Sequence, residues 1–325
     1  MYKVVSLFTG CGGCDQGLVG GFTFNRTDYA RLPYDIVYAL DIDQKALNTH
    51  KMNFECDQLI CGDICGIPSE SIPDHDILVG GFPCQSFSTV NPTKDPFDDR
   101  ANLYKQMVRI ANDKKPKVII AENVKGLMTL HKGQIFKRVC AEFEEAGYTL
   151  SYRLLNAANF GVPQKRERVI IVGFRKDYAH TFQFPEETTA GAWVPLSVAV
   201  PELAIDEKKY YFSERAVQGM KNAKNNMKRG LAQDLNEPCL TVTSHLAKVS
   251  LNSRDPVLLV DPERELYRRF TPREAARVQS FPDTFEFVGN EQDAYRQIGN
   301  AVPPVMFWHI ANAVSKQLSE CDNPH

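Results

Sequence analysis

Long apolar runs, an excess of charge of one sign and a matched pair of cysteine motifs are all missing from this chain of 325 residues. No apolar stretch approaches the roughly 20 residues that a membrane-spanning helix needs, which argues against an integral membrane protein. The 38 basic and 40 acidic side chains give a net charge of −2, so no overall field attracts nucleic acid. The first residues lack the apolar length of a signal peptide. We expect a soluble cytoplasmic protein in which any nucleic-acid contact depends on a local basic cleft.

The nine cysteines do not have the pattern of a disulfide scaffold or of a metal site. Their number is odd and their spacing uneven, which predicts reduced thiols. Cys11 and Cys14 have the spacing of a redox pair or of half a zinc site, but no second CxxC and no HxxxH follow. The seven histidines show no pairing. We therefore expect no metal and no catalytic histidine.

Short apolar segments alternate with amphipathic stretches through the first half of the chain. The predicted strands are residues 4–8, 36–40, 75–81, 117–121 and 168–174. Apolar residues at helical spacing predict helices over 103–111 and 136–143, and a further helix begins near Asp15. This alternation predicts an α/β fold with a doubly wound, mostly parallel sheet, whose ligand site lies beyond the carboxyl ends of the strands.

The alternation ends after Lys176. Residues 177–265 contain several prolines and two groups of basic residues (208–209 and 221–229), which indicates a smaller, irregular domain with a locally basic surface. The tail becomes apolar and helical again from 295 to 318. The predicted division is a catalytic and cofactor-binding domain (1–176), a small domain (177–285) and a segment that returns to the first domain (286–325).

A glycine-rich turn follows the first predicted strand. Gly10, Gly12 and Gly13 allow a ligand to approach the backbone closely. A dinucleotide fingerprint would have glycine at Asp15, and its acid would come about 20 residues further on. Here Asp41 comes 28 residues after Gly13, and residues 25–34 resemble an insertion. These residues alone fit either a nucleotide or nucleoside site or a plain tight turn.

A cysteine follows the third predicted strand, at the expected mouth of the site. Cys84 lies in the sequence GGFPCQSFS, whose residues suit an exposed turn better than a core. Glu122 ends the fourth strand, and Arg166 and Arg168 begin the fifth. A thiol, a carboxylate and a pair of guanidinium groups at one sheet edge indicate covalent catalysis on a polar heterocycle.

These motifs together resemble the DNA (cytosine-5)-methyltransferases of bacterial restriction-modification systems, over nearly the whole chain. The matches follow the family's order: residues 7–13 (LFTGCGG) with Gly17, 41–43 (DID), 62–64 (GDI), 81–85 (GFPCQ), 98–103 (DDRANL), 122–124 (ENV), 164–168 (QKRER), 268–274 (RRFTPRE) with 279–282 (QSFP), and 299–302 (GNAV). The resemblance implies a Rossmann-like methyltransferase fold whose small domain recognises the DNA target.

The resemblance also implies S-adenosyl-L-methionine as the methyl donor. The cofactor-binding residues that it implies are Phe8, Gly10, Gly12, Gly13, Asp41, Ile42, Asp63, Ile64, Pro83, Leu103, Asn300 and Ala301. Two of them depart from the family's pattern. Asp41 is one methylene shorter than the usual glutamate, and Ile42 replaces the aromatic residue often stacked on adenine.

The resemblance implies the following catalytic roles. The Cys84 thiolate adds to C6 of cytosine and makes C5 nucleophilic. Glu122 acts at N3 and the exocyclic amine, Arg168 holds O2, and Arg166 orients the ring or the surroundings of Cys84. Because C6 is inaccessible in a stacked duplex, the target base must be flipped out.

Double-stranded DNA is the implied partner. Residues 238–243 (PCLTVT) resemble the Thr-Leu or Thr-Val core of the target-recognition region, so the loop from Ser244 to Asn252 is expected to enter the major groove. The predicted DNA contacts are Gln85, Ser88, Thr241, His245, Lys248 and Arg268. By resemblance, the segment from Arg268 to Glu274 also anchors the hinge between the domains. A restriction endonuclease of the same specificity and a monomeric state are further expectations.

Three alternatives remain open at this point. One branch of the family methylates cytosine in transfer RNA, but its Pro-Pro-Cys element is Phe82-Pro83-Cys84 here. A nicotinamide-dependent oxidoreductase has only the glycine turn in its favour. An inactive DNA-binding relative would be expected to lack Cys84 or Glu122, and the sequence has both.

Overall fold

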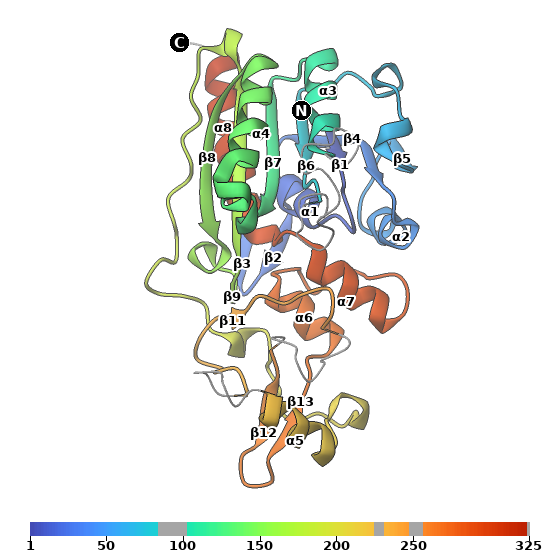
Figure 1. Ribbon diagram of the computed structural model, residues 1–325, viewed down its shortest axis with the longest axis vertical. Coiled ribbons are helices and arrows are strands. Elements are labelled where there is room, and N and C mark those ends of the chain that lie inside the picture. Colours follow the sequence, from blue (N-terminus) through green and yellow to red (C-terminus); the bar gives the residue numbers. More distant parts are fainter. Residues whose placement is uncertain (84–102, 224–230, 247–255, 324–325) are drawn as a thin grey trace.

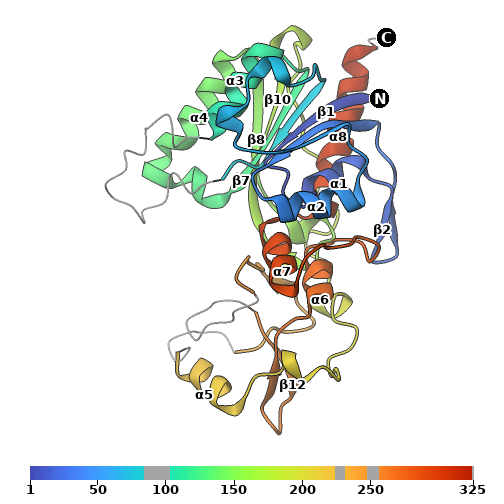
Figure 2. The same cartoon turned by 90° about the vertical axis from the view of Figure 1, so that its right-hand side faces the viewer.

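The computed structural model describes residues 1–83, 103–223, 231–246 and 256–323. It has a large lobe built on one sheet and a smaller lobe that carries α5 (Glu214–Ala223), β12 (Leu258–Asp261) and β13 (Leu266–Arg268) (Figures 1 and 2). Two helices, α6 (Pro272–Val278) and α7 (Glu291–Asn300), lie between the two lobes (Figure 1).

The sheet of the large lobe has seven strands in the order β5-β4-β1-β6-β7-β10-β8. Their bounds are β1 (Tyr2–Leu7), β4 (Tyr34–Asp41), β5 (Gln58–Cys61), β6 (Ile77–Gly80), β7 (Val118–Val124), β8 (Tyr148–Asn156) and β10 (Glu167–Arg175). The first five strands in this order pair in parallel, whereas β10 runs antiparallel to both β7 and β8. The prediction of a mostly parallel α/β sheet is confirmed.

Helices cover both faces of this sheet (Figures 1 and 2). Residues of α1 (Gly13–Val19) and α8 (Pro304–Asp322) belong to one core, and residues of α3 (Tyr104–Lys114) and α4 (Gln134–Glu145) belong to the other. Neighbouring strand residues alternate between the two cores: Val4 lies in the first and Val5 in the second, and Ile120 and Ile119 alternate in the same way. Because both faces are buried, these strands read as continuous apolar runs.

The five predicted strands correspond to β1, β4, β6, β7 and β10, but β5 and β8 were not predicted. Both lie at the ends of the sheet. Two residues of β5 are exposed and two are half-buried, and β8 has exposed residues at Tyr152 and Arg153, so neither segment has a continuous apolar run. The predicted helical tail is two helices, α7 and α8, separated at residues 301–303.

The predicted insertion at 25–34 contains most of a hairpin formed by β2 (Phe22–Phe24) and β3 (Thr27–Tyr29). Asn25 and Arg26 both have positive φ, as a tight two-residue hairpin turn requires. Tyr29 stacks on Phe22 with ring centroids 5.0 Å apart and meets Trp308 edge-on. The hairpin therefore packs against α8.

A third apolar core joins the smaller lobe to the returning tail. It includes Leu196, Val242 and Leu258 together with Phe281 and Ile298. Residues 178–184 precede this core and pack on the large lobe, where Phe182 is buried in the core of α1 and α8. The division at residue 177 stays a prediction, and the chain leaves the large lobe some residues after it.

None of the helices in the described ranges is both long and apolar enough to cross a membrane. Within those same ranges, the His, Cys, Asp and Glu side chains form no cluster that could hold a metal ion.

Candidate active site

A cavity of about 1190 Å³ lies at the carboxyl ends of β1, β4, β6 and β7. These ends meet at one edge because the four strands are parallel neighbours. Predicted site residues that line it are Phe8, Gly10, Gly13, Asp41, Ile42, Asp63, Ile64, Pro83, Leu103, Glu122, Arg166, Arg168, Asn300 and Ala301. Residues from both ends of the chain thus form one pocket.

The glycine turn forms one wall of this cavity. Phe8 has φ 55, an unusual backbone conformation for an aromatic residue, and Gly10 has φ 57. A Cβ on Gly13 would lie 2.6 Å from the carbonyl oxygen of Val302, so only glycine lets the turn approach the tail this closely. Gly12 does not line the cavity: it precedes α1 with φ 94, and a Cβ there would meet the ring of Phe54 at 2.3 Å.

The carboxylate of Asp41 holds the turn and the following loop together. Its Oδ2 accepts from the backbone N–H of Gly10 at 2.8 Å, and its Oδ1 accepts from the N–H of Asp43 at 2.8 Å. Each oxygen keeps a lone pair that a ligand hydroxyl could use. Beside it, Ile42 is 73% exposed and offers an apolar surface within the cavity.

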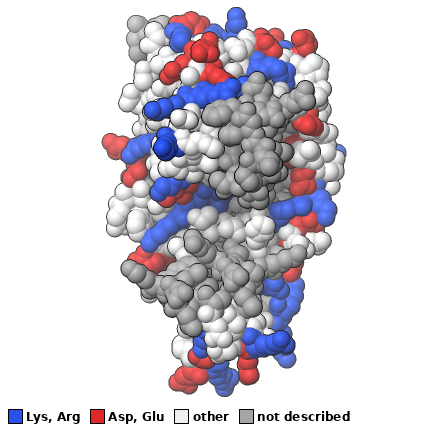
Figure 3. Space-filling model, in the orientation of Figure 1, with Lys and Arg blue, Asp and Glu red and all other residues white. Residues whose placement is uncertain are grey.

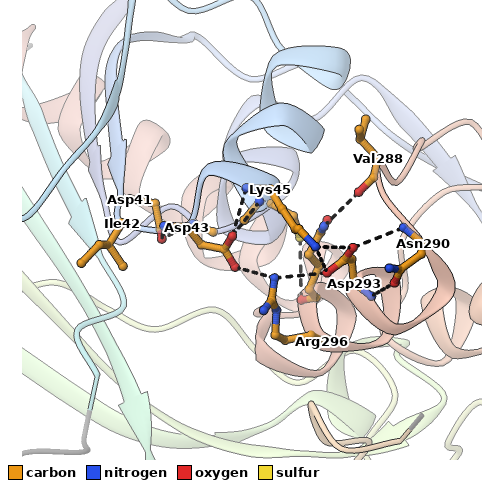
Figure 4. Close-up of polar contacts among 12 residues, drawn as sticks. Asp41, Ile42, Asp43, Lys45, Val288, Asn290, Asp293 and Arg296 are labelled. Carbon is orange, nitrogen blue, oxygen red and sulfur yellow. Dashed lines mark hydrogen bonds and ion pairs between the residues drawn. The ribbon is translucent and has the colours of Figure 1, made fainter.

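Ion pairs join this strand end to the tail of the chain (Figure 4). Asp43 caps α2 (Gln44–Asn53) and pairs with Arg296 of α7 at 3.0 Å, while Lys45 pairs with Asp293 at 2.9 Å. Arg296 also lines the cavity. These two ion pairs join α2 to α7 beside the cavity.

Asp63 and Ile64 begin a short 3-10 helix, η1 (Ile64–Gly66), after β5. The Asp63 side chain accepts from the N–H of Cys65 at 2.9 Å, and Ile64 is buried beneath it. The cavity therefore has hydrogen-bond acceptors at Asp41 and Asp63 and apolar side chains at Ile42 and Ile64. This combination of acceptors and apolar surface suits a nucleoside.

Glu122 and Arg168 form an ion pair of 2.9 Å on the neighbouring strands β7 and β10. Burial raises the pKa of Glu122 above its ordinary value, although Arg168 and Arg166 oppose the shift. The next residue, Asn123, is buried and donates to the carbonyl oxygen of Phe82 at 2.7 Å. This bond holds the segment that leads to Cys84 against the end of β7.

Arg166 is buried and holds three backbone carbonyls. Its terminal nitrogens donate to the carbonyl oxygens of Val242, Gly299 and Ala301 at 2.9–3.0 Å. Its Nε is buried and has no hydrogen-bond partner among the described residues. The guanidinium thus joins the smaller lobe to the tail, a role that the expected contact with the ring did not include.

Residues 238–243, the predicted recognition segment, pair directly with the motif at residues 164–168. The two-residue strands β9 (Gln164–Lys165) and β11 (Cys239–Leu240) are parallel. Thr241 Oγ1 donates to the carbonyl oxygen of Lys165 at 2.8 Å, so this hydroxyl serves an internal contact. His245 is exposed two residues beyond Thr243. Four predicted residues lie outside the described ranges: Cys84, Gln85, Ser88 and Lys248.

Arg268 lies in the interior, contrary to the expected DNA contact. It is 0% exposed and pairs with both oxygens of Glu274, at 2.6 and 2.7 Å. Its remaining donors bond to the carbonyl oxygens of Glu202, Leu203 and Arg269. No donor is left for a phosphate, and the geometry instead suits an anchor within the smaller lobe and α6.

Solved structures with a similar fold are methyltransferases. The chain superposes on S. pombe Dnmt2 with a TM-score of 0.75 at 19% identity, covering 99% of this chain and 100% of the other. The Entamoeba histolytica methyltransferase EhMeth gives a TM-score of 0.76 at 16% identity, covering 98% of this chain and 99% of the other. The fold is therefore that of the Rossmann-like S-adenosylmethionine-dependent methyltransferases.

Sequence comparison identifies the family. Residues 2–316 match the model of the C-5 cytosine-specific DNA methylases. The chain is 36% identical to the Type II methyltransferase M.NgoFVII of Neisseria gonorrhoeae, over 98% of this chain and 87% of the relative. It is 33% identical to M.FnuDI of Fusobacterium nucleatum, over 98% of this chain and 95% of the relative. The chain belongs to this family and is a DNA cytosine-5 methyltransferase.

Some cavity residues were not predicted from the sequence. Cys14, His131, Arg296 and Gln297 all line it. Arg296 lies one helical turn before Asn300, a spacing that could have indicated it. His131 has φ 46 in a short 3-10 segment, and no sequence pattern indicates that conformation.

Proposed function

We propose that this enzyme methylates C5 of a flipped cytosine in duplex DNA through a covalent bond from Cys84 to C6, with S-adenosyl-L-methionine as donor. The observation that carries the proposal is the partly buried Glu122–Arg168 pair, which lies beside Gly81–Pro83 in the same cavity as the glycine turn. The segment that ends at Pro83 leads directly to Cys84.

The cavity residues fit the proposed cofactor. The turn at Gly10 and Gly13 gives a close backbone approach, and Asp41 and Asp63 supply acceptors for hydroxyl and amino groups. When bound, S-adenosyl-L-methionine supplies an electrophilic methyl group. Asp41 and Asp63 would hold its nucleoside end, and the glycine turn would hold its amino-acid end.

Each catalytic residue then has one task. The Cys84 thiolate forms a bond to C6, and the electron pair of the C5–C6 double bond moves toward N3. Glu122 shares a proton with N3 as that charge develops, which its raised pKa favours. Arg168 donates to O2. C5 then bonds to the methyl group, and a base such as water takes the C5 proton. The C6–S bond breaks, the thiolate leaves, the N3 proton returns to Glu122, and the aromatic ring is restored.

We further propose that the enzyme protects DNA from a restriction endonuclease of the same specificity. The relatives M.NgoFVII and M.FnuDI are Type II methyltransferases, which supports this role. On the face shown in Figure 3, basic side chains lie at the left and right edges of the middle of the molecule, with acidic ones among them. This local charge suits a duplex despite the net charge of −2.

Trapping on a modified duplex tests the covalent step. Native enzyme should form a stable adduct with duplexes that carry 5-fluorocytosine at the target, because fluorine prevents the final elimination. The Cys84→Ser variant should form none and should lose methylation by orders of magnitude, yet still bind the cofactor. Methylation at near-native rate by this variant would contradict the covalent route.

Labelled methyl transfer tests the substrate. Duplex DNA and total cellular RNA are offered in parallel with labelled cofactor, and bisulfite sequencing of plasmid from expressing cells locates the modified cytosines. We expect label in DNA at one recurring site. Label confined to RNA would contradict the proposal.

A further inference from the structure

A buried carboxylate lies directly behind the glycine turn. Asp15 in α1 is 0% exposed and accepts from Ser6 Oγ at 2.7 Å and from the hydroxyl of Thr9. Its third partner is Nε2 of His50 in α2, at 2.9 Å. Ser6 and Thr9 both line the cavity, so one hydrogen bond separates Asp15 from its wall.

The charge of this carboxylate is not neutralised by its partners. Ser6 and Thr9 are neutral, and no described lysine or arginine forms an ion pair with Asp15. His50 is also fully buried, and its Nδ1 has no hydrogen-bond partner in the described structure. A doubly protonated ring would leave an unsatisfied N–H there, so the neutral ring that donates from Nε2 fits better. The network thus keeps one negative charge.

The field of Asp15 reaches the cavity. Cys14 lines the cavity, and burial, Glu122 and Asp15 together raise the pKa of its thiol. Among the other charges at the pocket, Glu122 pairs with Arg168 and Asp43 pairs with Arg296, whereas Asp41 and Asp63 accept from backbone N–H groups and form no ion pair in the described structure. Asp15 therefore adds to the negative potential of Asp41 beside the glycine turn.

We propose that Asp15 is a positioning and electrostatic residue that favours the cationic sulfonium cofactor over its neutral thioether product. This inference rests on the proposed function, because it assumes that the amino-acid end of the cofactor lies against the turn. Through Ser6 and Thr9 the same carboxylate also fixes the turn's geometry. The two effects differ in their consequence: a field discriminates between charged and neutral ligands, whereas geometry affects both alike.

Calorimetric titration with two ligands separates these effects. Dissociation constants of S-adenosylmethionine and S-adenosylhomocysteine are measured for native enzyme, Asp15→Asn and Ser6→Ala. In Asp15→Asn the cationic ligand should lose about threefold to tenfold more affinity than the neutral one, as expected for one partly screened charge. Ser6→Ala removes a hydrogen bond but no charge, so it should weaken both ligands by the same factor.

His50→Gln keeps a donor and leaves the carboxylate charged, so the ratio of the two affinities should stay native. If Asp15→Asn does not fold, Asp15→Ser, whose hydroxyl can meet Thr9, takes its place. An unchanged ratio in a folded Asp15 variant would overturn the inference. Failure of the native enzyme to bind either ligand would instead refute the proposed cofactor.

Discussion

Glu122 is a carboxyl group whose environment favours its protonated form. Burial raises its pKa, so the proton is retained to a higher pH than usual, and the acid is lost as pH rises through that value. If Glu122 gives its proton to N3, single-turnover methylation should have a descending limb on its alkaline side. Glu122→Gln should remove this limb and reduce turnover by about 10²- to 10⁴-fold.

Rapid-quench kinetics across pH would measure this limb. Glu167→Gln is the matched control, because Glu167 lies next to Arg168 in the chain but is exposed and pairs with Lys125. Its profile should match that of the native enzyme. A Glu122→Gln profile that keeps the descending limb would assign the limb to another group.

Substitution of Arg268 tests whether this arginine stabilises the fold or contacts DNA. Arg268→Gln would leave the carboxylate of Glu274 buried without its cation, which costs about 3–5 kcal/mol of unfolding free energy. Urea unfolding should show this loss. The slope of DNA affinity against salt should not change, because no phosphate contact is removed.

Arg264→Gln is the control for that experiment. The Arg264 side chain is 83% exposed and pairs with Asp261 at 3.6 Å, so its removal should cost at most about 1 kcal/mol. A weaker salt slope in Arg268→Gln, with stability preserved, would show that the arginine does contact DNA.

At the scale of single residues, motifs and order along the chain located most of the cavity lining. The contacts that each residue makes were harder to predict from the sequence. Arg166 and Arg168 are two residues apart, yet one bonds to distant carbonyls and the other to Glu122. That difference depends on three backbone segments that meet only in the folded chain. The interior position of Arg268 has the same origin.

Among the elements, α7 packs directly against residues 243–244 of the predicted recognition segment. A Cβ on Gly299 would lie 2.2 Å from backbone atoms of Thr243 and Ser244, closer than the structure can accept without movement. Gly299→Ala should therefore displace the recognition segment, lower the unfolding free energy by about 1–3 kcal/mol and reduce methylation.

Thermal unfolding and methylation assays on one preparation would show both effects. Gly66→Ala is the control, since no atom lies within 4 Å of a Cβ there. Native activity in Gly299→Ala would mean that the segment moves without consequence for catalysis.

The sequence predicted those strands that are buried on both faces of the sheet. The central strands β1, β4, β6 and β7 each contain a run of buried apolar residues because helices cover both faces, so the sequence indicates them clearly. The end strands β5 and β8 are partly exposed and mix polar with apolar residues, which conceals them. The reversal of β10 depends on its pairing with β7, and no local pattern determines it.

For the whole molecule, we expect that the residues that select the DNA target can be exchanged without loss of methyl transfer. We predict that grafting residues 177–265 from a relative with another target transfers that target, while Cys84 chemistry continues. Bisulfite sequencing of plasmid from cells that express the chimaera would identify its site. An active chimaera that keeps the parental site would place specificity elsewhere in the chain.

The attachment of the recognition segment has an evolutionary consequence. Gln164 accepts from the N–H of Val242 and Arg166 donates to its carbonyl oxygen, while β9 pairs with the backbone of β11. These bonds engage main-chain atoms, which every residue except proline supplies in the same arrangement. A segment acquired by recombination could thus be accommodated whatever side chains it carries there, provided that they fit the space. New target sites could arise by exchange of whole segments, without compensating changes in the catalytic lobe.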